Sequence, residues 1–190
     1  MFRVLMVCTG NICRSPMAEH LMREGLRARL GEEAEQFVFA SAGTFGLTGN
    51  PMEPFARDTL QARGIDGSGF RAKELAPFMV EGADLVLTAT REHRAAAATL
   101  WPQAARKSFT IREFDRLLSE LDPATLPTYD RLVRAHALVG AAASQRGLIR
   151  PDKPGDDDIT DPYRGPLTGY TACADLLEAS LQRPLDLLAG

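Results

Sequence analysis

The sequence is poor in cysteine and has no excess of charge of one sign. Three of its 190 residues are cysteines, an odd number that is too small to cross-link a chain of this length. Its 22 lysines and arginines stand against 25 aspartates and glutamates, a net charge of −3. We therefore expect free thiols in a reducing compartment, and we expect neither a disulfide scaffold nor a nucleic-acid partner.

Long hydrophobic runs are also missing. The longest apolar stretches, such as residues 95–98, are far shorter than the roughly 20 residues that cross a bilayer. Residues 1–3 lead directly into a short apolar run at 4–7, and no small-residue cleavage site of a signal peptide follows it. We expect a cytoplasmic protein without a membrane partner. Its length predicts one domain, since domains average roughly 150 residues.

Strand and helix patterns alternate along the first part of the chain. The pattern predicts strands at residues 3–8, 37–41, 83–89 and 107–111. Helical patterns are found at residues 16–29, 51–63 and 91–100, then at 112–147 with breaks near two prolines, and finally at 167–188. The first strand shows no polar alternation, which is typical of a parallel sheet covered on both faces. We predict an α/β fold, a three-layer sandwich with a central four-stranded parallel sheet.

A cysteine, five further residues and an arginine connect the first strand to the first helix. Ser15 is expected at the N-cap of that helix and Pro16 at its first position. A loop that turns from a strand into a helix points successive backbone N–H groups inward, and the helix dipole adds positive potential. The segment from Cys8 to Arg14 therefore predicts a phosphate-binding loop after the first strand.

The residue types in this loop suit phosphate chemistry. The planar fork of Arg14 can bind two phosphate oxygens, which the point charge of a lysine could not match. A positive loop stabilises the thiolate of Cys8, which is the nucleophilic form. Gly10 permits close backbone approach, and Asn11 tolerates the left-handed conformation. The alternative for Cys8 is a buried structural thiol.

Residues 8–19, Cys-Thr-Gly-Asn-Ile-Cys-Arg-Ser-Pro-Met-Ala-Glu, resemble the signature of the low-molecular-weight protein tyrosine phosphatases. The resemblance continues at residues 41–44, 49–54, 83–87 and 161–163. It covers most of the chain except residues 115–153, which look like a helical insertion within a single domain of residues 1–190. The resemblance alone does not indicate whether this insertion is a lid, a docking surface or inert packing.

The resemblance implies roles for individual residues. Cys8 would be the nucleophile, Arg14 the phosphate clamp and Asp161 the general acid. The remaining residues of the phosphate loop would be Thr9, Gly10, Asn11, Ile12, Cys13 and Ser15. Ser41 would support the loop, and Phe45 and Tyr163 would form walls for the substrate. The substrate would be a phosphorylated protein, with inorganic phosphate or a similar oxyanion in the site, and no cofactor or metal would be needed.

A physical argument for Asp161 stands beside the resemblance. A phenolate leaving group gains from a positioned proton donor, and a carboxyl near a dianion tends to keep its proton. The alternative is that the Asp-Pro pair only makes a turn. Spacing alone cannot choose the acid, because Asp156, Asp157 and Asp158 lie nearby; we interpret those three as a solvated loop.

The remaining titratable residues suggest less. His20, His93 and His136 lack the paired spacing of metal ligands, and we interpret them as surface or packing residues. Cys13 lies in the loop and could trap an oxidised Cys8 as a disulfide, or it could be a small buried residue. Cys173 is expected in the core.

Three alternative functions differ in what the sequence should contain. An arsenate reductase of this fold that relays a disulfide needs a downstream cysteine pair, and none lies between Cys13 and Cys173. A protein-arginine phosphatase typically has threonine where this chain has Ile12, whose apolar side chain favours an aryl phosphate. A silent phosphoprotein-binding module would have lost Cys8, Arg14 or Asp161.

Three positions depart from the family pattern. The family often has a histidine where Phe70 stands, an aspartate where Thr90 stands and a second tyrosine where Arg164 stands. These changes leave substrate preference and loop rigidity open.

Overall fold

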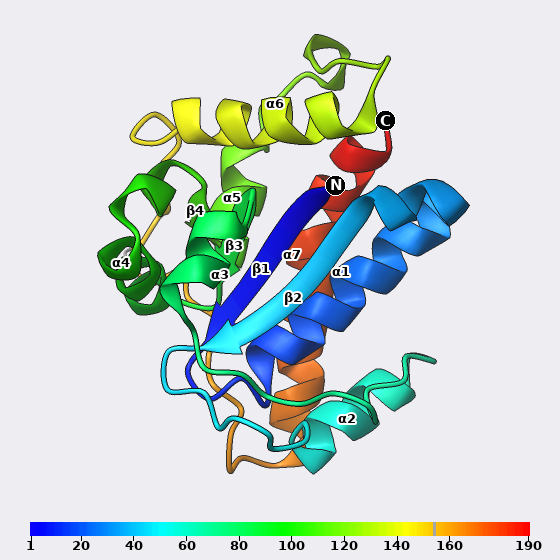
Figure 1. Ribbon diagram of the computed structural model, residues 1–190, viewed down its shortest axis with the longest axis vertical. Coiled ribbons are helices and arrows are strands. Elements are labelled where there is room, and N and C mark those ends of the chain that lie inside the picture. Colours follow the sequence, from blue (N-terminus) through cyan, green and yellow to red (C-terminus); the bar gives the residue numbers. More distant parts are fainter. Residues whose placement is uncertain (154) are drawn as a thin grey trace.

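The computed structural model describes residues 1–153 and 155–190, and at its centre lies a parallel four-stranded sheet (Figure 1). Its strand order is β2-β1-β3-β4. The strands are β1 (Phe2–Cys8), β2 (Phe37–Gly43), β3 (Leu85–Thr88) and β4 (Ser108–Thr110). Val4 of β1 pairs with Phe39 on one side and with Leu85 on the other. The sheet confirms the predicted fold class, although β3 and β4 are shorter than predicted.

Successive residues of β1 point into two separate hydrophobic cores. Val4 and Met6 belong to the larger core, together with side chains of α1 (Arg14–Leu30) and α7 (Leu167–Ala189). Leu5 and Val7 belong to the smaller core, with side chains of α3 (Pro77–Gly82) and α4 (Arg91–Leu100). All four strand residues are buried, so the strand is covered on both faces, as its lack of alternation predicted.

The remaining α-helices overlap the helical segments predicted at residues 51–63 and 112–147 and are shorter than those segments. They are α2 (Pro54–Gln61), α5 (Ile111–Leu117) and α6 (Arg131–Ser144), with 3₁₀ helices at Gly31–Gln36, Pro102–Arg106 and Pro123–Thr125. The short α3 and the first two 3₁₀ helices were not predicted, because one or two turns carry too little periodicity to be recognised. No helix in the described ranges is long and apolar enough to span a bilayer.

The predicted start of α1 is wrong. The helix begins at Arg14, its N-cap is Cys13, and no side chain of the described residues caps it. Ser15 therefore lies inside the first turn, where its hydroxyl is 2.9 Å from Cys8 Sγ. The first amides of α1 are left without a side-chain cap, which is the arrangement that suits an anion at a helix N-terminus.

Helix α6 lies at the opposite end of the sheet from the phosphate loop. Figure 1 shows it crossing the end where β1 begins, and the ring of His136 contacts Phe2, the first residue of β1, with ring centroids 5.0 Å apart. Its side chains at Ala135, Leu138 and Ala142 are buried in the larger core. Of the roles left open for residues 115–153, this placement excludes α6 as a lid over the loop and agrees with packing.

Candidate active site

The phosphate loop follows the carboxyl end of β1, where parallel α/β sheets place their ligands. A cavity of about 200 Å³ opens there. It is lined by Cys8, Thr9, Gly10, Ile12, Cys13, Arg14, Phe45, Leu47, Asp161 and Tyr163. Every predicted site residue except Asn11, Ser15 and Ser41 lines it, and the prediction missed Leu47. The structure thus brings the thiol, the guanidinium and the carboxylate together in one cavity.

Neighbouring backbone holds the loop with its carbonyl groups turned away from the phosphate position. The amides of Thr44, Phe45 and Leu47 donate to the carbonyl oxygens of Cys8, Thr9 and Gly10 at 2.9 to 3.1 Å. The amide of Glu53 donates to the carbonyl of Ile12 at 2.9 Å. Because the carbonyls are bound on the outside, the loop N–H groups remain available on its inner side.

Asn11 organises the interior of the loop. Its backbone has φ of 55°, which confirms the left-handed conformation predicted for it. Its Nδ2 donates to the hydroxyls of Ser15 and Ser41, and its Oδ1 accepts from the Lys73 amide, at 2.8 to 2.9 Å. One fully buried side chain thus makes three hydrogen bonds, which tie the loop to α1, to β2 and to the segment at Lys73. Asn11, Ser15 and Ser41 lie behind the loop.

The network continues from Ser41 into α1. The Ser41 hydroxyl donates to Glu19 Oε2 at 2.6 Å, and the Glu19 carboxylate forms an ion pair with Arg23. Glu19 is buried. Glu19 is the last residue of the signature at residues 8–19, and no role was predicted for it.

The protein's own backbone approaches the loop most closely at Gly43. A Cβ atom on Gly43 would lie 2.3 Å from the carbonyl oxygen of Thr9, closer than any tolerated contact. A Cβ atom on Gly10 would make only an ordinary contact, 3.5 Å from Ile12 Cγ1. The end of β2 can therefore lie against the loop only because residue 43 has no side chain.

Arg14 is buried and makes contacts on both sides of the cavity. Its Nη1 donates to the Ile159 carbonyl at 3.1 Å, and its Nη2 contacts Asp161 Oδ2 at 2.6 Å and Thr9 Oγ1 at 3.3 Å. Its Nε is a buried donor without a hydrogen-bond partner among the described residues. The Asp161 side chain keeps 45% of its surface exposed, so it lies at the cavity mouth with one oxygen on Arg14.

His93 is a site residue that sequence reasoning missed. It is buried, with Nε2 2.9 Å from Thr9 Oγ1 and Nδ1 2.8 Å from Thr90 Oγ1. Burial, followed by the charge of Arg14, lowers the pKa of His93 from 6.5 to about 4, so the ring is neutral near pH 7. Since Thr9 Oγ1 accepts from Arg14, its hydroxyl hydrogen can go to His93 Nε2, which leaves the ring hydrogen on Nδ1 for Thr90.

The interpretation of His93 as a surface or packing residue is therefore wrong. The available signal was its place in the first turn of the helix after β3, because the carboxyl ends of neighbouring parallel strands meet at one edge of the sheet. No group of three His, Cys, Asp or Glu side chains that could hold a metal ion occurs in the described ranges 1–153 and 155–190.

The interpretation of residues 156–158 as a solvated loop is wrong for two of the three. Asp157 is buried and pairs with Arg116 at 2.8 Å. Asp158 pairs with Arg91 at 3.0 Å. These pairs anchor the segment that leads to Asp161, which alone of the four carboxylates lines the cavity.

The other two cysteines are buried free thiols. Cys173 lies in the larger core, as predicted, and burial raises its pKa to about 12. Burial, with the charge of Asp161 adding to it, also raises the pKa of Cys13 far above its usual value. Trapping an oxidised Cys8 would require the Cys13 thiolate, which this environment disfavours; the disulfide stays a prediction.

Comparison with known proteins agrees with this geometry. The model of the low molecular weight phosphotyrosine protein phosphatase family matches residues 3–125. A protein-arginine-phosphatase of Geobacillus stearothermophilus is 29% identical over 96% of this chain and 93% of its own length. A low molecular weight protein-tyrosine-phosphatase of Acinetobacter johnsonii is 34% identical over 57% of this chain and 70% of its own length.

Solved structures match over nearly the full length. The low molecular weight protein tyrosine phosphatase from T. tengcongensis superposes with a TM-score of 0.71 and 30% identity, covering 98% of this chain and 99% of that one. The arginine phosphatase from Geobacillus stearothermophilus gives a TM-score of 0.69 and 27% identity, covering 98% and 92%. With the cysteine loop, the sheet and the family match in agreement, the chain belongs to the low-molecular-weight phosphotyrosine protein phosphatase family of cysteine-based hydrolases.

Proposed function

We propose that this protein hydrolyses phosphotyrosine in protein substrates through a phosphocysteine formed on Cys8. The observation that carries the proposal is the composition of the 200 Å³ cavity, which holds a thiol and a guanidinium beneath apolar walls. Ile12, Phe45, Leu47 and Tyr163 supply those walls. An aryl ring can bury its apolar faces against them while its phosphate lies in the loop.

The loop supplies the groups for the first step. Arg14 binds the phosphate, which gives its buried Nε an acceptor. The Cys8 thiolate attacks phosphorus in line with the departing oxygen. The phosphorus–oxygen bond breaks, and its electron pair leaves with the tyrosine oxygen.

Asp161 moves the protons in both steps. It protonates the departing phenolic oxygen, and it then takes a proton from the water that attacks the phosphocysteine, so that the sulfur–phosphorus bond breaks and phosphate leaves. The family match ends at residue 125, before Asp161, so its role is supported by geometry. Its carboxylate lines the cavity 2.6 Å from Arg14 Nη2 and is released when phosphate takes that guanidinium.

Hydrolysis of p-nitrophenyl phosphate in the presence of a chelator tests the reaction. We expect turnover by the wild-type protein and none by Cys8→Ser. A Cys173→Ser variant is the matched control, because that thiol lies in the core away from the cavity lining. Substantial turnover by Cys8→Ser would refute the nucleophile, and loss of wild-type turnover with chelator would refute the metal-free mechanism.

Phosphoarginine is a second candidate substrate, and one observation favours it. The arginine phosphatase relative aligns over 96% of this chain, including most of the segment beyond residue 125, whereas the Acinetobacter tyrosine phosphatase aligns over 57%. Ile12 weighs against it, because an apolar wall offers nothing to the polar guanidinium of phosphoarginine.

A side-by-side comparison of phosphotyrosine and phosphoarginine peptides decides between the two. We expect a higher kcat/KM for phosphotyrosine in the wild type, and a shift toward phosphoarginine in Ile12→Thr. A wild-type preference for phosphoarginine would refute the proposed specificity, and an unchanged preference in Ile12→Thr would refute the role of Ile12.

We also propose a cytoplasmic location and one domain spanning the chain. Three buried free thiols suit a reducing compartment. Residues of α6 share the larger core with α1 and α7, which supports packing as the role of the segment 115–153. Fractionation of the host cell tests the first proposal, and a single cooperative unfolding transition tests the second.

A further inference from the structure

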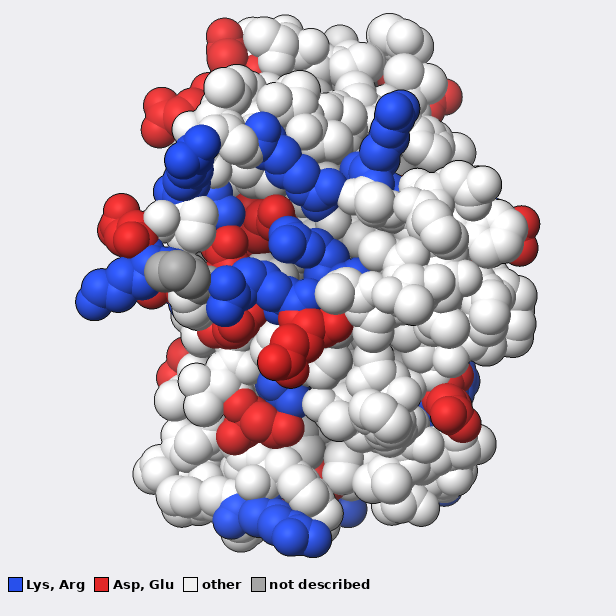
Figure 2. Space-filling model, turned by 90° about the vertical axis from the view of Figure 1, so that its left-hand side faces the viewer, with Lys and Arg blue, Asp and Glu red and all other residues white. Residues whose placement is uncertain are grey.

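A second pocket lies on the face formed by α4, α5 and the segment after α6. Figure 2 shows lysine and arginine side chains gathered around a hollow on this face. The pocket has a volume of about 490 Å³, within the roughly 300–1,000 Å³ typical of small-molecule sites. It shares no lining residue with the cavity of the phosphate loop. We call it the arginine pocket.

The arginine pocket has an excess of positive charge. Its charged lining residues are Arg91, Arg94, Arg116, Arg146, Arg150, Glu113 and Asp157. Arg91 is matched by Asp158, which pairs with it at 3.0 Å from outside the lining. Within the lining, the four remaining arginines face two carboxylates, an excess of two positive charges. Asp115, Asp152 and Asp156 line the adjoining pocket, which shares Arg116 and Arg150, and are not part of this lining. In a chain whose net charge is −3, such a local excess favours an anion of charge −2.

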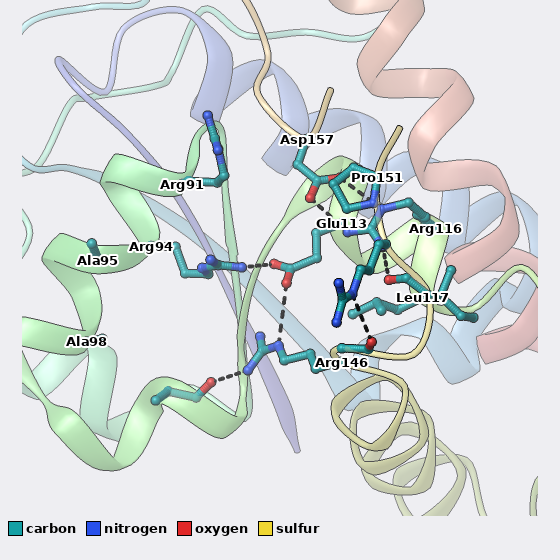
Figure 3. A pocket seen from close by; sticks show the side chains of 14 residues that line it. Arg91, Arg94, Ala95, Ala98, Glu113, Arg116, Leu117, Arg146, Pro151 and Asp157 are labelled. Atoms are coloured by element: carbon teal, nitrogen blue, oxygen red, sulfur yellow. Dashed lines mark hydrogen bonds and ion pairs between the residues drawn. The ribbon is translucent and has the colours of Figure 1, made fainter. Parts of the chain in front are cut away.

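Buried carboxylates hold the guanidinium groups in place. Figure 3 shows Arg94 and Arg146 approaching the buried Glu113 from two sides, and Arg116 bound to Asp157. Arg146 also donates to the backbone carbonyls of Ala105 and Ser108. Because these arginine side chains are already held in place, they lose little conformational entropy when an anion binds.

Two guanidinium groups retain donors for a ligand. The Nε of Arg146 is buried and makes no hydrogen bond with any described residue, although it lies 3.5 Å from a Glu113 oxygen. Arg150 donates to the Gly147 carbonyl and has no carboxylate within ion-pair distance in the described ranges. Ala95, Ala98 and Leu117 add an apolar wall beside these donors.

From this arrangement we propose that the arginine pocket binds the phosphate monoester of a small organic molecule. The phosphate dianion neutralises the two excess charges and takes hydrogen bonds from Arg146 and Arg150. The organic part lies against the alanine and leucine wall. A guanidinium matches phosphate geometry through two parallel N–H groups, which explains the exclusive use of arginine among the basic residues of the lining.

Methyl NMR of the five isoleucines separates this site from the phosphate loop. Ile149 lines the arginine pocket, Ile12 lines the cavity of the loop, and Ile65 lines neither. The probe is glucose 6-phosphate, with glucose as the uncharged control, in a Cys8→Ser background that prevents turnover. We expect a saturable shift of the Ile149 signal with glucose 6-phosphate and none with glucose, while Ile65 stays unchanged.

Arg150→Gln provides the test of the site itself, because it removes a positive charge without stranding a buried carboxylate. We expect the affinity read at Ile149 to fall about tenfold, the value of one charge-assisted hydrogen bond, with the Ile12 titration unchanged. Arg57→Gln, an exposed arginine paired with Asp58 on α2, is the matched control and should leave both titrations as they were.

Three results would overturn the proposal. One is an Ile149 signal that stays still while Ile12 saturates. Another is an Ile149 affinity unaffected by Arg150→Gln. The last is a response at Ile149 to a phosphopeptide with none to glucose 6-phosphate, which would assign the pocket to protein substrates. None of these results bears on hydrolysis at Cys8, which is measured separately.

Discussion

The neutral, buried His93 predicts a specific dependence of stability on pH. Its pKa is lowered from 6.5 to about 4 in the folded protein, so the unfolded chain binds the proton more tightly. The stabilisation is present above pH 6.5 and is lost as the pH falls toward 4. Linkage gives a loss of about 2 kcal/mol in unfolding free energy between about pH 7.5 and pH 5, approaching about 3 kcal/mol at lower pH. Urea unfolding at several pH values measures it.

The variant His93→Gln isolates this contribution, because glutamine keeps a hydrogen-bonding amide and does not titrate. We expect its unfolding free energy to fall by about 2 kcal/mol less than that of the wild type over the same pH interval. His136→Gln, at the surface on α6, is the matched control for replacing a histidine by glutamine. Equal pH dependence in the wild type and His93→Gln would refute the argument that a buried neutral ring supports Thr9.

Three other changes have defined outcomes. Asp161→Asn should lower kcat for phenyl phosphate by roughly 10²–10⁴-fold and for p-nitrophenyl phosphate by less, since a good leaving group needs little protonation; equal losses would contradict its role as acid. Gly43→Ala places a Cβ 2.3 Å from the Thr9 carbonyl oxygen and should sharply lower kcat/KM for p-nitrophenyl phosphate, whereas Gly82→Ala, with open space around it, should not. Asn11→Ala removes three hydrogen bonds at a left-handed residue and should cost about 3 kcal/mol in urea unfolding; a cost below about 1 kcal/mol would contradict its organising role.

The fold was predictable where periodicity was long or burial complete. β1 and the long helices α1 and α7 carry enough apolar positions to identify their type, and α4 was predicted with its observed bounds, residues 91–100. The predicted start of α1 failed for a physical reason. Ser15 looked like a cap because it precedes Pro16, yet its hydroxyl contacts Cys8 and Asn11 inside the site. The Ser15 hydroxyl makes its hydrogen bonds within the site and therefore does not cap the helix.

The site was predictable where its residues are consecutive in sequence. Residues 8–15 form one loop, so their types and order suffice to indicate a phosphate nest. The supporting residues come from distant segments: Gly43 ends β2, Leu47 follows it, and His93 lies in the first turn of α4. Their contacts with the loop depend on how the crossover connections arrange the strands, and a local sequence pattern does not predict that arrangement. This is why His93 was interpreted as a surface or packing residue and why no role was predicted for Gly43.

The choice of the acid shows what the structure adds to spacing. Asp157, Asp158 and Asp161 are the same residue type within five positions, and the sequence alone offers no ranking. Their partners separate them. Asp157 is buried against Arg116, and Asp158 takes both the backbone amide and the guanidinium of Arg91. Breaking the Asp157 pair would leave a buried charge without its partner. Asp161, half exposed, is bound to Arg14, the guanidinium that phosphate occupies in the proposed mechanism. In that mechanism substrate binding frees the Asp161 carboxyl at the cavity mouth, and the nearby dianion favours its protonated form, which the leaving oxygen needs.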